Sequence, residues 1–139
     1  MSEAYRVRLR TVGGGPTALG EAGPFTLVAD RPAAAGGGGV GFNGGQLLYL
    51  SIAACWSNDL YREAATMGID LDGVEITVDG DFPSRGSGST PISVSVVVHS
   101  AAPEARVREL IAEVGRVAEI PRAIRDATPI EVNATVEGS

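Results

Sequence analysis

The sequence predicts an α+β fold, because strand-like segments lie in pairs around a long helix instead of alternating singly with helices. Three observations support this prediction: short segments that alternate polar and apolar residues, a long apolar helix near the middle, and a second helix with one apolar face. The predicted order of elements is β-β-α-β-β-α-β. With 139 residues the chain fits a single domain, predicted to span residues 1–139.

The N-terminal part of the chain is predicted to form two strands and a glycine-rich loop. Residues 5–11 alternate apolar and arginine side chains, and residues 24–29 (PFTLVA) form a short apolar segment, both typical of strands. Four consecutive glycines follow at residues 36–39. Because glycine loses the most backbone entropy when it is ordered, we expect a mobile loop that serves as a plain connection.

The predicted central helix begins at Asn43 or Gly44 and ends at Met67, before Gly68, a residue typical of the position after a helix. Its first half, residues 47–56 (LLYLSIAACW), is apolar nearly all round. A helix of that kind is covered by other elements on every side. The remaining predicted elements leave little material to do so, and we therefore expect a homodimer in which the partner subunit covers part of this helix.

The second half of the chain is predicted to contain a hairpin, a helix and a final strand. Residues 74–82 and 92–99 alternate as strands do, and a turn-forming segment joins them. A helix is predicted from Pro103 to about residue 118, because apolar residues from Val107 to Val114 recur on one face. Pro121 interrupts this helix, and a short helical turn over residues 122–127 and a last strand over residues 129–136 are predicted to follow.

Composition argues against several classes of function. The formal net charge of −6 makes nucleic acid and anionic membranes unfavourable partners, because neither is attracted to an acidic surface. One cysteine and one histidine exclude an intramolecular disulfide and a Cys/His zinc cage, and no metal or cofactor is predicted. The N-terminal residues lack the apolar core of a signal peptide, and no apolar segment has the length of a membrane span, so a cytoplasmic protein is expected.

Cys55 is the single cysteine, and the residues around it leave its role open. Free cysteine is among the most often buried residue types, so a small buried apolar side chain is the simplest interpretation. A reactive thiol needs a lowered pKa, which a nearby cation can supply. Asp59, four residues further along the helix, would instead disfavour the thiolate. An activating charge has to come from elsewhere, and Arg31 and Arg122 are the candidates.

The arrangement of motifs along the chain resembles the OsmC/Ohr family, the osmotically inducible and organic hydroperoxide resistance proteins. The resemblance rests on the order of its parts: Asp30-Arg31-Pro32, a glycine-rich loop, the helix start GFNGGQLLYLSIAAC, a helix end rich in small residues, and the strand VEITVDG. It runs from about residue 25 to residue 136 and includes the Ile120-Pro121 break. No single motif is diagnostic, but their order and spacing together are fairly specific.

The resemblance implies an interlocked homodimer with a thiol site at the subunit interface. In the peroxidase members, a first cysteine that matches Cys55 attacks the peroxide, and a second cysteine in a Cys-Pro motif then closes a disulfide. A loop arginine, which Arg31 could match, and a glutamate at the helix start hold the thiolate ready. This sequence has Ile120-Pro121 in place of the Cys-Pro motif and Gly44-Gly45 in place of Pro-Glu, so catalysis through an internal disulfide is excluded.

Two hypotheses follow. In the first, the protein is a one-cysteine peroxidase that reduces an organic hydroperoxide with Cys55, and an external thiol restores it. In the second, peroxidase chemistry is lost and the interface pocket binds or transforms a small apolar molecule. Acid–base work by Asp59 or Glu63 is conceivable there, although such residues are more typical of a solvated helical face. The predicted site residues are Cys55 and Arg31 for catalysis, and Phe42, Gln46, Tyr49, Trp56, Asp59 and Arg122 for binding.

Overall fold

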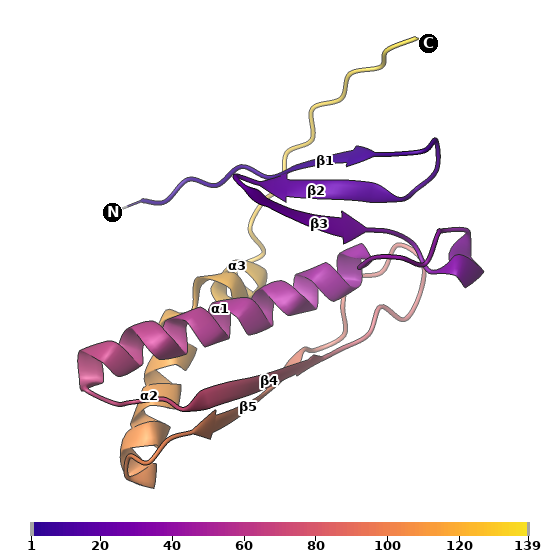
Figure 1. Cartoon of the computed structure of the whole chain (residues 1–139). Coiled ribbons are helices and arrows are strands. Elements are labelled where there is room, and N and C mark those ends of the chain that lie inside the picture. The colour runs from indigo at the N-terminus through magenta and orange to yellow at the C-terminus, as the bar shows by residue number, and fades with distance from the viewer. Residues whose placement is uncertain (1, 139) are drawn as a thin grey trace. The chain divides into compact units, whose positions relative to one another are not determined.

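The computed structural model describes residues 2–138 and has an α+β fold, as predicted from the sequence (Figure 1). The central helix, the hairpin after it and the next helix lie where the sequence places them. Three features differ from the prediction: a strand at residues 18–22 was missed, the expected last strand is not formed, and the break after the second helix falls at Ala118 instead of Pro121. The next helix covers Glu119–Arg125 and contains Pro121, because proline is tolerated in the first turn of a helix. In chain order the elements are β1 (Arg8–Thr11), β2 (Ala18–Ala22), β3 (Phe25–Ala29), the 3-10 turn η1 (Ala33–Ala35), α1 (Gly44–Met67), β4 (Gly73–Asp79), β5 (Ser93–His99), α2 (Glu104–Val117) and α3 (Glu119–Arg125).

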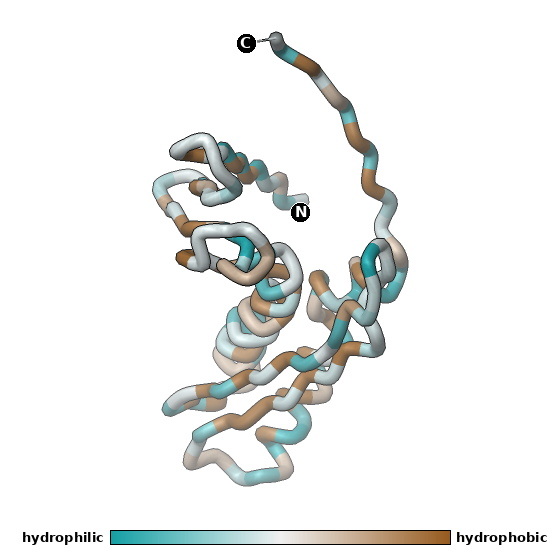
Figure 2. The backbone as a smooth tube through the Cα atoms, turned by 90° about the vertical axis from the view of Figure 1, so that its right-hand side faces the viewer, coloured by the Kyte–Doolittle hydropathy of each residue, from teal (hydrophilic) through white to brown (hydrophobic). Residues whose placement is uncertain are grey.

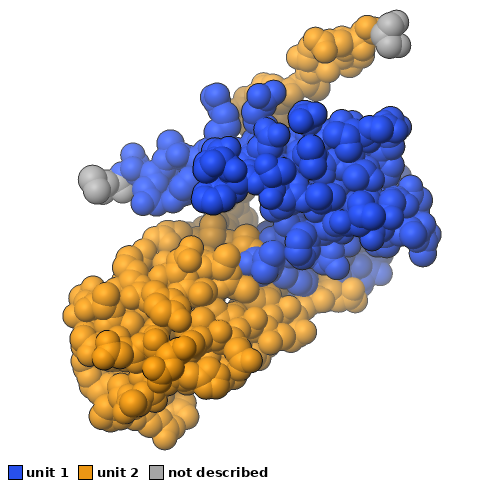
Figure 3. All heavy atoms as spheres, in the orientation of Figure 1, with its two compact units in different colours: residues 1–50, 82–90 blue, residues 51–81, 91–139 orange. Residues whose placement is uncertain are grey.

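The chain packs as two compact units, coloured separately in Figure 3. Unit 1 comprises residues 1–50 and 82–90, and unit 2 comprises residues 51–81 and 91–139. Helix α1 contributes its first residues to unit 1 and the remainder, including Cys55, to unit 2. The units are not consecutive pieces of sequence, and the single domain over residues 1–139 stays a prediction.

Unit 1 contains an antiparallel sheet in the order β1-β2-β3. Gly20 of β2 pairs with Leu9 on one side and Leu27 on the other. A tight turn at Gly23, whose φ is +56°, joins β2 to β3. The sequence did not indicate β2 because its residues, ALGEA, are small or polar and lack the β-branched and aromatic side chains that mark strands.

The glycine-rich loop is held by hydrogen bonds and is not the plain mobile connection expected from the sequence. Its centre is the buried carboxylate of Asp30, which accepts hydrogen bonds from the Thr17 hydroxyl and from the backbone N–H groups of Arg31, Gly38 and Val40. Burial alone would raise the pKa of Asp30, but these hydrogen bonds together lower it. A side chain at Gly38 would meet the Asp30 carboxylate at 2.7 Å, so glycine is needed here for the close approach.

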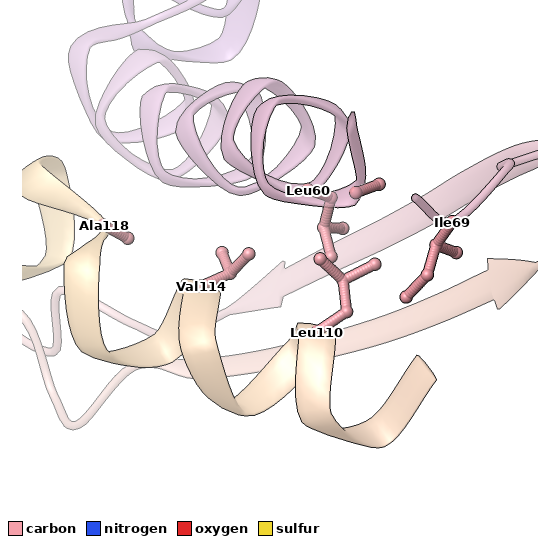
Figure 4. Packing of buried hydrophobic residues seen from close by; sticks show 6 residues of the cluster. Leu60, Ile69, Leu110, Val114 and Ala118 are labelled. Carbon is pink, nitrogen blue, oxygen red and sulfur yellow. The ribbon is translucent and has the colours of Figure 1, made fainter. Parts of the chain in front are cut away.

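Unit 2 is built around a hydrophobic core between α1, α2 and the β4–β5 hairpin (Figure 4). Leu60 of α1 and Leu110 and Val114 of α2 have no exposed surface. The hairpin covers one side of this core, because the paired residues Val74↔Val98 and Ile76↔Val96 pack against the cluster. The predicted apolar face of α2 is thereby confirmed at its centre. The remaining buried members of the cluster are Ala64, Ile69 and Ala118.

The C-terminal segment is exposed, although a strand was predicted over residues 129–136. Residues 129–138 have no helix or strand assigned. Figure 2 shows hydrophobic and hydrophilic residues alternating along this tail, as in a strand, yet Ile130, Val132 and Val136 are 89%, 82% and 96% exposed. A strand forms only where its backbone groups find a hydrogen-bonded neighbour, and the described chain offers this segment none.

Candidate functional site

Cys55 lies in unit 2 on the face of α1 that also carries Asp59 and Arg62. The three residues are four and three positions apart, a spacing that places side chains above one another along a helix. The Sγ atom of Cys55 lies 3.8 Å from Oδ2 of Asp59, which lets the thiol donate a weak hydrogen bond to the carboxylate. Asp59 is 4% exposed, so it does not belong to the solvated face on which its type was expected.

The start of α3 supplies the other side of the site. The chain leaves helical geometry at Ala118, whose ψ is 117°, and α3 then begins at Glu119. One carboxylate oxygen of Glu119 lies 4.0 Å from the Cys55 sulfur. The backbone N–H groups of Ile120 and Glu119 act in the opposite direction to the carboxylates and lower the pKa of the Cys55 thiol. Ile120 and Pro121 lie within α3, and this helix brings the Glu119 carboxylate and backbone N–H groups of its first turn toward the Cys55 sulfur.

Arg62 holds the two carboxylates. Its guanidinium lies 3.2 Å from Asp59 and 3.9 Å from Glu119. About half of the Arg62 side chain is exposed, whereas the Asp59 side chain is almost completely covered. Without this cation the buried Asp59 carboxylate would lack a countercharge, and its ionised form would be less favourable.

The electrostatics of the site favour the neutral thiol. Burial raises the pKa of Cys55, the N–H of Ile120 opposes this, and the negative charges of Asp59 and Glu119 raise it further. Burial likewise raises the pKa of Asp59, against the effect of Arg62. The two pKa shifts have different consequences: Cys55 keeps its proton at neutral pH, and Asp59 becomes a better proton acceptor than an ordinary aspartate.

The same atoms are close enough to suggest a cation site. One ligand atom from each of Cys55, Asp59 and Glu119 lies within 4.8 Å of the others. Arg62 already supplies positive charge to both carboxylates, however, and a metal ion would have to displace it. The arrangement therefore fits proton transfer at sulfur better than metal binding.

The predicted activating arginines make other contacts. Arg31 lies in unit 1, where its Nε donates a hydrogen bond to the backbone oxygen of Ala35. Arg122 donates a hydrogen bond to the backbone oxygen of Arg116, near the end of α2. Among the described residues, the guanidinium that ion-pairs with the carboxylates beside Cys55 is that of Arg62.

The other predicted binding residues are distributed over both units. In unit 1, Gln46 and Asn43 exchange hydrogen bonds that cap the start of α1. Tyr49 stacks on Phe82 with ring centroids 5.8 Å apart, and its hydroxyl hydrogen-bonds Ser89. Phe42 is half exposed beside β3. In unit 2, Trp56 packs against the core of α1 and α2.

Sequence reasoning missed Arg62 and Glu119. The signal for Arg62 was present, because positions 55, 59 and 62 follow helical spacing. Glu119 follows the break at Ala118, but its contact with Cys55 joins residues 64 positions apart, and no local pattern reveals such a contact. Arg31 and Arg122 were predicted as activating charges from the resemblance to the OsmC/Ohr family and from their positions near predicted loops.

A second feature, an apolar cavity of about 370 Å³, lies in unit 1. Leu9, Phe25 and Leu27 of the sheet and Leu47 of α1 line it. Gly20 lies among them, and the absence of a side chain there leaves space in front of Leu27. None of the predicted binding residues lines this cavity.

Solved structures share this fold. An OsmC-like protein from Mycoplasma pneumoniae matches with a TM-score of 0.77 and 21% identity, over 97% of this chain and 98% of that one. An organic hydroperoxide resistance protein from Vibrio cholerae, solved with captopril bound in one of its active sites, matches with a TM-score of 0.64 and 25% identity, over 90% and 88%. The organic hydroperoxide resistance protein OhrB of Bacillus subtilis matches with a TM-score of 0.61 and 24% identity, over 88% and 91%.

The family model described as OsmC-like protein matches residues 36–133, which include α1, the β4–β5 hairpin and α2. The chain therefore belongs to the OsmC-like family, as its motifs indicated. No curated protein matches the sequence at a significant level. Within the described part of the chain, no helix combines the length and the apolar character needed to cross a membrane.

Proposed function

We propose that the protein is a one-cysteine peroxide reductase, in which Cys55 reduces an organic hydroperoxide and an external thiol regenerates it. Membership of the OsmC-like family and the structural likeness to organic hydroperoxide resistance proteins support the reaction class. The observation that carries the proposal is the environment of the Cys55 sulfur, which lies 3.8 Å from the Asp59 carboxylate and 4.0 Å from that of Glu119.

The chemistry balances without an internal second thiol. The sulfur of Cys55 bonds to one peroxide oxygen, the O–O bond breaks, and the thiol proton ends on the departing alcohol. The product is a sulfenic acid. A first external thiol condenses with it and releases water, which leaves a mixed disulfide. A second external thiol then attacks the external sulfur of that disulfide, so that Cys55 leaves as the thiol and the two external thiols leave joined as a disulfide.

The proposal predicts a sulfenic acid confined to Cys55. Intact-mass spectrometry after one equivalent of cumene hydroperoxide should show one dimedone adduct per chain, together with loss of the hydroperoxide. The Cys55→Ser variant should give neither. A wild-type thiol that stays unmodified, and that alkylating agents reach only after denaturation, would identify a structural cysteine and refute the proposal.

We also propose that the chain acts as a homodimer. The apolar half of α1 is not fully covered, because Leu50 is 47% exposed in the described chain. The C-terminal segment carries exposed apolar residues at alternate positions, and it pairs with no strand among residues 2–138. A partner subunit would supply both a cover for α1 and a neighbour for residues 129–136.

Light scattering tests the dimer directly. The full chain should have twice the mass of one 14.2 kDa subunit, and a variant ending at residue 128 should shift toward the monomer. As a control, Glu109→Gln changes an exposed side chain on α2, outside α1 and the C-terminal segment, and should leave the mass unchanged. A monomeric full chain at micromolar concentration would contradict the proposal.

The cavity of unit 1 favours a second candidate function, the binding of a small apolar molecule. Its volume of about 370 Å³ falls within the range of small-molecule sites, and Leu9, Phe25 and Leu27 give it an apolar lining. This candidate does not need a reactive thiol, so it is independent of the sulfenic acid result.

Titration with a fluorescent probe such as anilinonaphthalene sulfonate distinguishes binding in this cavity from nonspecific binding to other exposed apolar surface. Saturable binding at one site per chain is expected for the wild type. A Leu27→Arg variant, which places a charge in the cavity, should lose it, while Leu50→Arg on α1 should not. Equal binding by all three proteins would rule the cavity out.

A further inference from the structure

The proton of the Cys55 thiol needs an acceptor before the sulfur can attack. Burial and two nearby carboxylates raise the pKa of this thiol, so the thiolate is scarce at neutral pH. In the described structure Arg31 and Arg122 make contacts with backbone oxygens. The atom to which the thiol can donate at the shorter distance is Oδ2 of Asp59, at 3.8 Å.

We propose that Asp59 is a catalytic proton-transfer residue for Cys55 and that Arg62 is the positioning residue that holds it. The inference rests on the proposed peroxide chemistry of Cys55. Asp59 accepts the thiol proton as the sulfur attacks, and it delivers that proton to the oxygen of the departing alcohol. The S–O bond forms while the O–O bond breaks, and Asp59 ends the step ionised, as it began.

Geometry distinguishes Asp59 from Glu119. Asp59 is 4% exposed and fixed by Arg62 at 3.2 Å, whereas the Glu119 side chain is 69% exposed and lies 3.9 Å from the same guanidinium. Because Asp59 is shielded from water and Glu119 is not, a proton that Asp59 accepts is less readily lost to solvent. The raised pKa of Asp59, caused mainly by burial, also brings its proton affinity nearer to that of the thiol.

The charged groups around Asp59 come from two elements. Helix α1 contributes Cys55, Arg62 and Glu63, and α3 contributes Glu119. Arg62 contacts all three carboxylates, with Glu63 at 3.4 Å. Its positive charge stabilises the ionised, proton-accepting form of Asp59, which burial and the other two carboxylates disfavour.

Two reagents separate proton transfer from simple electrostatics. Iodoacetamide requires only a thiolate, because iodide leaves without a proton, whereas a hydroperoxide also requires a proton for the departing alcohol. In Asp59→Asn the negative charge that raises the thiol pKa is gone, so alkylation at pH 7 should accelerate, by about tenfold for each unit that the pKa falls. Reaction with cumene hydroperoxide should slow by about tenfold or more, because the proton carrier is lost.

Glu119→Gln is the matched comparison, since it removes a carboxylate 4.0 Å from the same sulfur. Both reactions should accelerate in this variant. Arg62→Gln should slow the hydroperoxide reaction, and Arg62→Lys, which keeps the charge, should restore part of the rate. Glu109→Gln breaks an ion pair with Arg106 on α2 and controls for loss of a carboxylate elsewhere.

The outcomes are distinct. Opposite changes with the two reagents in Asp59→Asn support the inference, and acceleration with both, as for Glu119→Gln, overturns it. A wild type that does not react with hydroperoxide refutes the proposed function itself.

A second measurement is used if circular dichroism shows that Asp59→Asn is unfolded. The rates of the wild-type protein with both reagents are then compared in heavy water and ordinary water. A larger slowing for hydroperoxide than for iodoacetamide supports the transfer of a proton in that step, and equal slowing contradicts it.

Discussion

The close packing of α1 against α2 is the constraint on which the candidate site depends. Leu60, Leu110 and Val114 are fully buried where the two helices meet above the β4–β5 hairpin. Each such side chain contributes about 1.5–3 kcal/mol on burial, whereas an ion pair with a partly exposed partner contributes about 1 kcal/mol or less. Packing, and not the Arg62 contacts, therefore fixes the helices, and the turn after α2 then brings Glu119 to the Cys55 sulfur.

The charge arrangement that results is unusual for a reactive thiol. Thiolates are ordinarily stabilised by a nearby cation, but the nearest charged groups to Cys55 are the carboxylates of Asp59 and Glu119. Arg62 acts on the sulfur only through them. Such a site suits a thiol that releases its proton to a neighbour during the reaction better than one that is stored as a thiolate.

Much of the fold could be predicted from the sequence, because periodicity reports burial directly. The alternation in β4 and β5 and the apolar face of α2 gave these elements and most of the core of unit 2. Strand β2 could not be predicted in this way, since ALGEA carries no strand pattern and is held by its two neighbours. The strand pattern at residues 129–136 failed for the opposite reason: pattern alone does not supply a hydrogen-bonding partner.

The candidate site was predictable only in part. Cys55 could be chosen as the single thiol, and Asp59 follows from helical spacing. The defined conformation of the glycine-rich loop could not be anticipated. It depends on the Asp30 carboxylate, which accepts hydrogen bonds from backbone N–H groups up to ten residues away. Glu119 likewise reaches the site through the tertiary fold, which local sequence does not record.

The rate at which Cys55 reacts with an organic hydroperoxide, compared with that of free cysteine at the same pH, tests the central claim most directly. Stopped-flow measurement with cumene hydroperoxide in excess, followed by the loss of titratable thiol, gives both rate constants under identical conditions. The account predicts that Cys55 reacts faster than free cysteine at pH 7 by about a hundredfold or more, the lower end of the gain expected from a positioned proton-transfer group. A rate equal to or below that of free cysteine would mean that burial and the two carboxylates suppress the thiol, and that the protein uses another part of its structure.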